Sequence, residues 1–411
     1  MFVALLLASF TSAAQSPRVQ AGSGTSVQRP HRSVRPNTFR QANWPQLGYD
    51  AAHDGFNPLE TTLNPSNVAQ LQQAWSFSTG SGNNAGNVVY DNGVLYAASA
   101  NGTLFAIDAS TGTRLWRRPT GSGYSTSGSV AAVDSGMVFT VCTLPNSGYQ
   151  GMCALNASTG ALVWSYTAPG ATSYAETAPA VAGGNVYFGA CGTSCAYIAL
   201  NETDGSVVWS KAESGGCSLN GGSPPAIHNG ELLAGVDCNK GSVIALNAQD
   251  GRGIWSRSLN GGSVEGVSAA NGLVGVAGSS FFGVLSAQTG DVLWSNSGCG
   301  SYGLPAFAYH DVFMPCSFEL YAYKARARGR HGSGVRVWTA GGNQAAIGNG
   351  VVYSLLEPSP GNIPGALAAT NGAYLWLASG SSAAYGVPIV VNGVVYGACS
   401  GTNVCAWSLP S

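Results

Sequence analysis

The chain of 411 residues has a net charge of −1, and only 9% of its residues are charged. A balance this close to zero provides no global field for nucleic acid or an anionic membrane, so any partner has to be recognised at a local site. Glycine is abundant, with 58 residues, which favours tight turns over amphipathic helices. The composition therefore predicts an all-β protein with no nucleic-acid partner.

The N-terminal residues differ in composition from the rest of the chain. Residues 1–14 contain a short apolar run ending in Ser-Ala-Ala, which is typical of a cleaved secretory signal peptide, although a basic start is missing. Residues 15–41 contain five arginines and no acidic residue, a composition typical of a disordered linker. No apolar run reaches the ~20 residues of a transmembrane helix. We predict an exported monomer, secreted, periplasmic or extracellular, whose folded domain spans residues 42–411.

An eleven-residue pattern recurs along the chain with few changes. It reads ALNASTGALVW at Ala154–Trp164, ALNETDGSVVW at Ala199–Trp209 and ALNAQDGRGIW at Ala245–Trp255. Further copies, one of them stretched by an insert, and an N-terminal fragment bring eight tryptophans into register: Trp75, Trp116, Trp164, Trp209, Trp255, Trp294, Trp338 and Trp376. Their spacings of 38 to 48 residues match the ~40–50-residue period of propeller blades.

Each period has the same order of strand and turn signals. Short alternating apolar stretches separated by glycine-containing turns predict four strands, A to D, in each repeat. The C–D turn is the Thr-Gly or Asp-Gly of the eleven-residue pattern, and the A–B turn reads Asn-Gly at Asn92, Asn229, Asn271, Asn349 and Asn392. Both turns lie on one face. The more variable B–C and D–A loops share the opposite face, which we call the loop face.

The repeated corner has a physical reason. A four-stranded blade cannot cover both of its faces alone, so it has to stack on its neighbours. The tryptophan buries a large ring between blades, while the Asp or Asn and the Thr hold the turn by local hydrogen bonds. The pattern resembles the tryptophan-docking motif of the eight-bladed pyrroloquinoline-quinone (PQQ) propellers, a family that includes quinoprotein alcohol dehydrogenases and a related outer-membrane assembly propeller. The resemblance covers roughly residues 42–409 and implies an all-β, eight-bladed propeller of four-stranded antiparallel blades.

The two ends of the repetitive region complement each other. Residues 386–409 supply strands A, B and C but end before a D strand, whereas residues 71–78 read as a D strand without its A, B and C. We predict that the two segments join in the eighth blade. This closure would pair strand edges that otherwise invite aggregation.

Ten cysteines fall into five neighbouring pairs on the predicted loop face. The expected disulfides are Cys142 with Cys153, Cys191 with Cys195, Cys217 with Cys238, Cys299 with Cys316, and Cys399 with Cys405. The number of alternative pairings is too large for the sequence alone to prove this set. Metal binding is the rival interpretation, but the spacings lack C-x-x-C clusters and no histidine lies at ligand spacing.

Residues at the start of each A strand are expected to line a central funnel. They are Asn84, Thr126, Glu176, Asn220, Glu265, Tyr302, Gln344 and Tyr385, with Tyr124 and Tyr174 just upstream. The two carboxylates, Glu176 and Glu265, are the catalytic candidates, because they could orient a sugar hydroxyl or act as acid and base. Glu176 is also a candidate calcium ligand. The plainer interpretation is a wet, polar channel without a specific role for either residue.

The resemblance implies one enzymatic function, a PQQ- and calcium-dependent dehydrogenase that oxidises an alcohol or sugar. The sequence departs from that pattern, because no two cysteines are adjacent and every tryptophan except Trp44 and Trp407 is assigned to a blade corner. We therefore expect no cofactor and interpret the chain first as a scaffold that binds a small molecule or a protein on the loop face. A PQQ dehydrogenase is the alternative, and a carbohydrate-binding propeller is the second alternative.

Two remaining features fit no catalytic pattern. Four histidines, His53, His228, His310 and His331, are interpreted as loop or surface residues. The basic insert at 324–330 is expected on the C–D side of blade 6, exposed to solvent and opposite the predicted site.

Overall fold

The computed structural model describes residues 42–410 apart from short gaps. The gaps are 81–84, 122–130, 144–149, 168–173, 176, 192–193, 214–218, 220–222, 239, 260–261, 298–299, 301–302, 357–361, 382–383 and 385. The predicted signal peptide and linker, residues 1–14 and 15–41, lie outside the described residues. All described strands belong to one compact unit. No helix in the described part of the chain is long and apolar enough to cross a bilayer.

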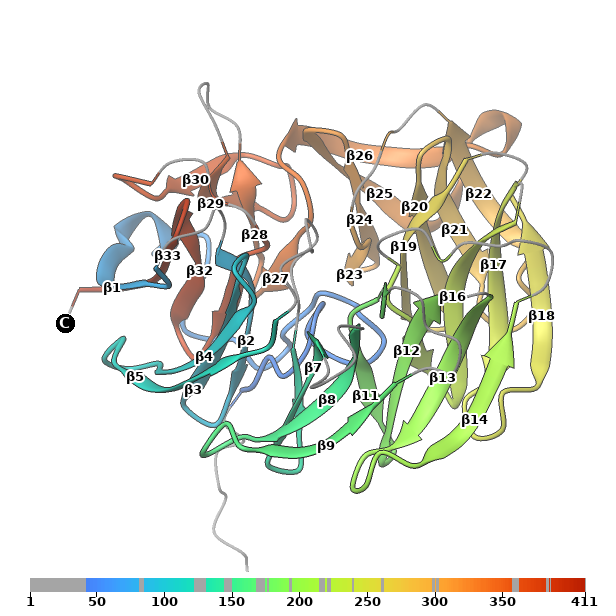
Figure 1. Ribbon diagram of the computed structural model, residues 1–411. Helices are drawn as coiled ribbons and strands as arrows, with labels where there is room; N and C mark the ends of the chain where they lie inside the picture. The colour runs from blue at the N-terminus through green and yellow to red at the C-terminus, as the bar shows by residue number, and fades with distance from the viewer. Residues whose placement is uncertain are drawn as a thin grey trace, which may run out of the picture. The chain divides into compact units, whose positions relative to one another are not determined.

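The chain folds into eight antiparallel sheets, one for each repeat (Figure 1). Blade 1 contains β2 (Ala85–Asp91), β3 (Val94–Ser99), β4 (Thr103–Asp108) and β5 (Arg114–Pro119). Blade 2 contains β6 (Ala132–Asp134), β7 (Met137–Thr143), β8 (Gln150–Asn156) and β9 (Leu162–Tyr166). Blade 3 contains β10 (Tyr174–Ala175) and β11 (Ala180–Ala182), which both pair with β12 (Asn185–Cys191), then β13 (Cys195–Asn201) and β14 (Val207–Ala212). Blade 4 contains β15 (Ala226–His228), β16 (Glu231–Cys238), β17 (Lys240–Asn247) and β18 (Gly253–Ser258).

The second half of the chain repeats this order. Blade 5 contains β19 (Val264–Ala270), β20 (Leu273–Gly278), β21 (Phe281–Ser286) and β22 (Val292–Ser297). Blade 6 contains β23 (Ala306–Ala308), β24 (Asp311–Cys316), β25 (Glu319–Arg328) and β26 (Gly334–Gly341), with a short 3-10 turn η3 (Arg330–Gly332) in its extended C–D hairpin. Blade 7 contains β27 (Ala346–Gly348), β28 (Val351–Leu356), β29 (Ile363–Ala368) and β30 (Tyr374–Leu377). Blade 8 contains β31 (Ile389–Val391), β32 (Val394–Ser400), β33 (Asn403–Ser408) and β1 (Gln72–Ser78).

The first strands of the blades form a closed ring. Each of β2, β6, β11, β15, β19, β23 and β27 contacts the first strand of the next blade, and β31 contacts β2. The B strands between are almost continuously apolar because both faces of a blade are covered: every residue of β20 is buried, whereas the outer strand β22 is partly exposed. The predicted eight-bladed, all-β propeller is confirmed.

Blade 8 is assembled from both ends of the described chain. Strand β1 pairs antiparallel with β33, and Trp75 lies opposite Ala406. Figure 1 shows the blue β1 beside the red β33. The predicted closure, in which an N-terminal D strand completes the C-terminal A to C strands, is therefore confirmed.

The corner tryptophans connect each blade to the next. Every indole Nε1 donates a hydrogen bond of 2.8–3.3 Å to a backbone carbonyl across the blade boundary. The acceptors of Trp75, Trp116, Trp164, Trp209, Trp255, Trp294, Trp338 and Trp376 are, in order, the carbonyls of Ala109, Ala157, Glu202, Ala248, Ala287, Ala325, Ala369 and Leu71. Leu71 follows the 3-10 turn η1 (Val68–Gln70), which takes the place of a corner motif in blade 8 because no continuous C–D hairpin exists there.

The eleven-residue pattern is the receptor for the preceding blade's tryptophan. In blade 1, Asp108 Oδ1 accepts the amide N–H groups of Ser110 and Thr111, both at 2.9 Å, and shapes the turn. Gly112 then has a φ of +72°, and a Cβ on it would lie 2.7 Å from the Trp75 ring. Glycine is required at this position for two reasons: it adopts the left-handed backbone conformation, and its lack of a side chain lets the backbone lie against the indole.

Three of the five predicted disulfides lie within the described residues and are confirmed. They join β7 to β8 through Cys142 and Cys153, β12 to β13 through Cys191 and Cys195, and β32 to β33 through Cys399 and Cys405. Cys316 is also disulfide-bonded. The pairings of Cys217 with Cys238 and of Cys299 with Cys316 involve residues outside the described set and stay predictions.

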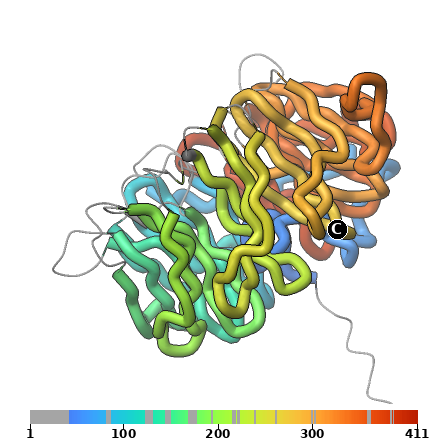
Figure 2. The backbone as a smooth tube through the Cα atoms, turned by 90° about the vertical axis from the view of Figure 1, so that its right-hand side faces the viewer, coloured from blue at the N-terminus to red at the C-terminus, as the bar shows by residue number. Residues whose placement is uncertain are grey.

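Residues 42–60, which we call the strap, run around the channel beside the first strands. The strap makes at least one hydrogen bond of 2.6–2.9 Å to the first strand of every blade, in blade order. Seven first-strand amides donate to it: Tyr90 to Trp44 O, Val133 to Pro45 O, Val181 to Gln46 Oε1, Ile227 to Ala51 O, Ala269 to Ala52 O, Phe307 to Asp54 O and Ile347 to Gly55 O. At blade 8 the direction reverses, and Asn57 Nδ2 donates to Val390 O. Figure 2 shows the blue strap among the blades from the side.

The strap corrects one sequence-based expectation. His53 lies in irregular chain, as expected, but it is fully buried rather than at the surface. Its Nδ1 lies 2.6 Å from the Leu47 carbonyl and its Nε2 lies 3.1 Å from the Pro225 carbonyl. Burial lowers the pKa of His53, and these carbonyls together with Asp50 oppose the shift. A neutral imidazole carries one N–H, so one of the two carbonyls accepts a hydrogen bond from the ring at a time; spacing in the sequence does not reveal this buried position.

Candidate functional site

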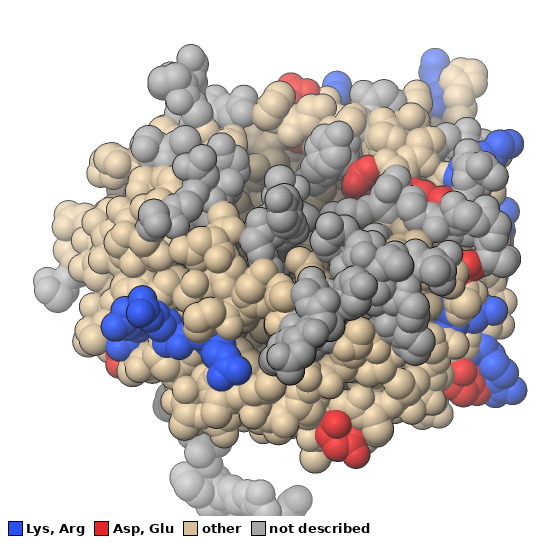
Figure 3. All heavy atoms as spheres, viewed as in Figure 1, with Lys and Arg blue, Asp and Glu red and all other residues tan. Residues whose placement is uncertain are grey.

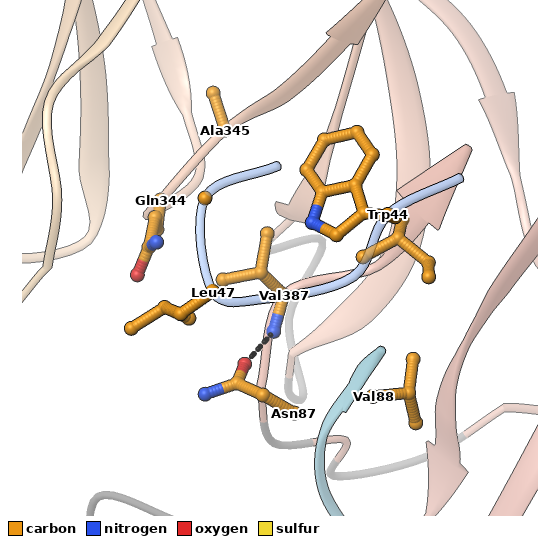
Figure 4. Close-up of a pocket in the computed structure, with 9 residues that line it drawn as sticks. Trp44, Leu47, Asn87, Val88, Gln344, Ala345 and Val387 are labelled. Atoms are coloured by element: carbon orange, nitrogen blue, oxygen red, sulfur yellow. Dashed lines mark hydrogen bonds between the residues drawn. The ribbon is translucent and has the colours of Figure 1, made fainter. Parts of the chain in front are cut away.

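The strap forms one side of a cavity in the channel. The cavity is small and partly open, and it is lined by residues from blades 1, 7 and 8 and from the strap (Figure 4). Trp44 and Leu47 come from the strap, while Asn87, Gln344 and Val387 come from the starts of three A strands. The cavity therefore lies where the strap meets the predicted funnel.

The polar groups of the cavity are amides. Asn87 Oδ1 accepts the backbone N–H of Val387 at 2.7 Å, which ties the A strand of blade 1 to that of blade 8 (Figure 4). Gln344 lies across from this pair, in blade 7, as the sequence analysis expected for a funnel residue. That Gln344 contacts a ligand stays a prediction. The cavity offers neutral donors and acceptors against an apolar floor.

Trp44 is a lining residue that the sequence analysis did not include. It is 2% exposed and packs edge-on against Tyr49, with ring centroids 5.2 Å apart. Its backbone exchanges two hydrogen bonds with Tyr90, so the indole is fixed relative to blade 1. Its position outside the tryptophan register was the available signal, but no sequence pattern placed it in the channel.

Glu265 is the one carboxylate candidate that the described residues include. It lies in β19 at the start of the blade 5 A strand and accepts a hydrogen bond from Ser263 Oγ. Asp237, at the end of β16 in blade 4, accepts the Val264 amide at 3.1 Å. Burial raises the pKa of Glu265, Ser263 opposes this and the nearby Asp237 adds to it. Glu265 thus holds its proton to a higher pH than an ordinary glutamate, as suits a group that donates to a ligand.

The other predicted site residues are not placed. Asn84, Tyr124, Thr126, Glu176, Asn220, Tyr302 and Tyr385 lie outside the described residues, and of Tyr174 only the backbone, in β10, is described. The ring of funnel residues is therefore a prediction for these positions, as is the proposed calcium ligation by Glu176.

The described residues do not by themselves fit the quinone site that the resemblance implies. Within them, no group of three or more His, Cys, Asp or Glu residues is placed to hold a metal ion. The described disulfides join cysteines 4, 6 and 11 positions apart rather than adjacent ones. The corner tryptophans are committed to blade packing through their Nε1 groups. We derive no catalytic step through the quinone.

Charge is sparse on the surface that surrounds the site. Figure 3 shows a face on which most described side chains are uncharged, with one group of basic atoms at its lower left and acidic and basic groups elsewhere on it. The basic insert lies in the long β25–β26 hairpin, on the C–D side as expected, and Lys324 pairs with Asp311 at 2.7 Å. A strongly charged ligand therefore has no described field to attract it.

Comparisons with known families agree with this fold. Residues 122–326 match the family described as outer membrane protein assembly factor BamB, and residues 44–134 match the beta-propeller domain of glucose/ethanol/alcohol dehydrogenases. The chain belongs to the PQQ-like β-propeller family.

Its relatives carry several different names. A tetrathionate hydrolase of Acidithiobacillus ferrooxidans is 30% identical over 202 residues, which are 46% of this chain and 38% of that protein. The quinohemoprotein alcohol dehydrogenase of Comamonas testosteroni is 32% identical over 136 residues, 32% of this chain and 19% of that protein. The chain thus spans well under half the length of these relatives.

Solved structures match over most of the propeller. The crystal structure of the Comamonas testosteroni alcohol dehydrogenase superposes with a TM-score of 0.73 at 15% identity, over 90% of this chain and 80% of that one. BamB from Moraxella catarrhalis gives a TM-score of 0.61 at 15% identity, over 82% of this chain and 99% of that one. At this identity the likeness shows the shared fold alone.

Proposed function

We propose that this protein is an exported propeller that binds a small neutral molecule, or one side chain of a protein partner, in its central channel from the loop face. The observation that carries the proposal is the cavity between the strap and the A strands of blades 1, 7 and 8. The strap occupies the A–B end of the first strands, so a ligand reaches the cavity from the other end.

The size and chemistry of the cavity limit the ligand. The pocket has room for little more than one water molecule, far less than the ~300–1,000 Å³ of typical small-molecule pockets. Gln344 and Asn87 offer amide groups, and Leu47 and Val387 offer apolar contacts. This combination favours one small, uncharged group of a ligand, such as a hydroxyl or an amide, with the rest of the ligand outside the pocket.

Export is supported by the cysteine chemistry. Three disulfides within the described residues indicate an oxidising compartment, because cytosolic thiols are kept reduced. The signal-like residues 1–14 point the same way. The clipped B–C hairpins of blades 2, 3 and 8 also stiffen the loop face, which reduces the ordering cost when a partner docks there.

A quinone- and calcium-dependent dehydrogenase is the second candidate. Several relatives are named as quinone-dependent alcohol dehydrogenases, while another is named as a hydrolase and a matching family as an assembly factor. The propeller alone therefore does not determine an activity. The specific support for an enzyme is Glu265, whose raised pKa suits proton transfer.

Binding and turnover can be separated with the purified full chain. Calorimetric titration with ethanol, 1-butanol, glucose and tetrathionate would test binding, and dye reduction after addition of PQQ and calcium would test oxidation. We expect saturable binding of an uncharged ligand that Gln344→Ala weakens about tenfold, the loss of one good hydrogen-bonding contact. The exposed Gln288→Ala is the matched control.

Three results would change this conclusion. Quinone-dependent turnover that Glu265→Gln abolishes would replace the scaffold with the dehydrogenase. Hydrolysis of tetrathionate would favour the named hydrolase activity. Binding that Gln344→Ala and Gln288→Ala leave equally unchanged would remove the cavity as the site.

A further inference from the structure

The strap contacts the same structural position in every blade. The bonded first-strand residues are Tyr90, Val133, Val181, Ile227, Ala269, Phe307, Ile347 and Val390, each two positions before the first residue of an A–B turn. Because the blades are repeats, the propeller presents eight equivalent backbone positions around one end of its channel, seven bonded through their N–H and Val390 through its carbonyl. The strap is not itself repetitive, yet it satisfies all eight.

These backbone groups lie on a free strand edge. Each first strand pairs with its B strand on one side only, so its other edge faces the channel. Unpaired edges are templates for the addition of another chain segment. The ring of first strands therefore presents eight strand edges that no other strand covers. Such an edge is the feature by which a sheet binds a peptide.

The strap fits this surface closely. Gly55 has a φ of +72°, and a Cβ on it would lie 2.6 Å from the Ala306 Cβ in blade 6. Gly48, with a φ of +65°, lies within a turn of the strap itself, because a Cβ on it would lie 2.8 Å from the Cα of His53. Where the strap backbone is out of reach at blade 3, Gln46 substitutes its side-chain amide, which accepts from Val181 N at 2.9 Å and donates to Val181 O at 3.3 Å.

Both ends of the strap are fixed at neighbouring blades. At its start, Asn43 Nδ2 donates to the carboxylate of Asp91 in blade 1 at 2.6 Å. At its end, the carboxylate of Glu60, only 3% exposed, accepts the backbone N–H groups of Leu63 and, in blade 8, Gly393 at 2.9 Å each. The strap thus completes the circuit from blade 1 to blade 8.

We propose that the A–B end of the channel is a peptide-binding site whose ligand is residues 42–60 of this chain, bound in cis, and that it accepts the same sequence in trans from a second copy. Recognition uses the side-chain amides of Gln46 and Asn57, the two glycines at 48 and 55, and the buried His53. This site lies at the opposite end of the channel from the proposed ligand entrance, so the proposal does not rest on the proposed function.

The connection after the strap allows the strap to be separated from the rest of the chain by a single cut. Thr61, Thr62, Pro65 and Ser66 are exposed and belong to no strand before β1 begins at Gln72. A cut between Pro65 and Ser66 therefore severs the covalent link while leaving every strap-to-blade hydrogen bond and strand pairing in place.

The test uses the full chain, folded before it is cut. A site-specific protease sequence is inserted between Pro65 and Ser66, the native protein is cleaved, and the products are separated by gel filtration. We expect the N-terminal fragment to co-elute with the propeller. A fluorescent synthetic peptide of residues 42–60 should then exchange into the nicked protein and saturate, and unlabelled peptide should displace it.

Matched peptides make the result specific. The Gly55→Ala peptide should bind at least tenfold more weakly, because its added Cβ meets Ala306, and a scrambled peptide of the same composition should not bind. Release of the fragment on cleavage, whether the propeller stays folded or not, would overturn the proposal. Retention of the fragment without any exchange, or equal binding of the scrambled peptide, would also overturn it.

Discussion

The outer corners and the inner strap link the blades in two different ways. At the outside, each corner tryptophan donates one hydrogen bond to the next blade, and the receptor is encoded again in every repeat. At the inside, one non-repeating segment makes at least one hydrogen bond to every blade in turn. Both arrangements therefore give each blade at least one hydrogen bond to another part of the molecule. The outer one is distributed over the chain, whereas the inner one depends on nineteen consecutive residues, 42–60.

This difference predicts different responses to mutation. A change at one outer corner affects two blades and leaves the other seven corner tryptophans in place, although a large buried ring is lost. A change in the strap removes smaller contacts, but it affects one continuous segment that contacts the eight blades one after another. The following experiments compare the two, from the largest expected effect to the smallest.

Removal of a corner indole should be the most damaging change. Trp294 is 1% exposed and packs against Tyr323 with ring centroids 5.1 Å apart. Trp294→Ala should lower the free energy of unfolding by about 3–5 kcal/mol, the usual cost of truncating a buried aromatic side chain. Trp294→Phe, which keeps a ring and loses the bond to Ala325, should cost clearly less. Denaturant titration followed by fluorescence measures both, and equal losses would show that the ring is not the main contribution.

The receptor glycine should be the next most sensitive position. Gly112→Ala places a Cβ 2.7 Å from the Trp75 ring at a φ of +72°, so it should cost about 2–4 kcal/mol. Gly93→Ala is the control, since its φ is +87° but nothing lies within 4 Å of the added Cβ. It should cost only about 1 kcal/mol, from backbone strain. Equal destabilisation of the two variants would remove the indole contact as the reason for the repeated glycine.

Within the strap, substitution of Gln46 tests the contact with one blade, blade 3. Gln46→Ala leaves both backbone groups of Val181 without their side-chain partner, which should cost about 1–3 kcal/mol. Gln70→Ala, at an exposed position in η1, should be close to neutral. If the two glutamine variants unfold at the same denaturant concentration, the strap does not contribute to stability at blade 3.

The strap should also make stability depend on pH. Burial, together with the nearby Asp50, raises the pKa of Asp54 to about 8. A carboxyl whose folded pKa lies above its unfolded value stabilises fully only at low pH, and this stability is lost as pH rises toward the folded pKa. From about pH 6.5 to about pH 7.5 the loss should approach 1.4 kcal/mol per pH unit. Asp54→Asn should flatten this slope, and an unchanged slope would assign it to another group.

The repeated parts of the molecule were predictable from the sequence and the strap was not. Eight tryptophans in register, Asn-Gly turns and the split terminal blade determine the fold, because each repeat confirms the others. The disulfides at Cys142, Cys191 and Cys399 followed from the predicted B–C hairpins. These features are local or periodic, and a sequence displays such features directly.

The strap and the cavity depend on contacts between residues far apart in sequence. His53 and Pro225 are separated by 172 positions and Asn57 and Val390 by 333. No periodicity marks the strap, so His53 looked like a surface residue and Trp44 like a closure residue. Gln344 was placed in the channel because its position within the repeat was known. Sequence reasoning thus located groups that belong to the repeat, and missed the single segment that contacts all repeats.

Hydrogen exchange of the first-strand amides tests the central claim most directly. The claim is that one segment satisfies the inner edge of every blade. The amides of Tyr90, Val133, Val181, Ile227, Ala269, Phe307 and Ile347 should exchange as slowly as amides in the fully buried strand β20, and Gln46→Ala should accelerate Val181 ahead of the others. Rapid exchange of these amides in the intact protein, as on an open strand edge, would contradict the account.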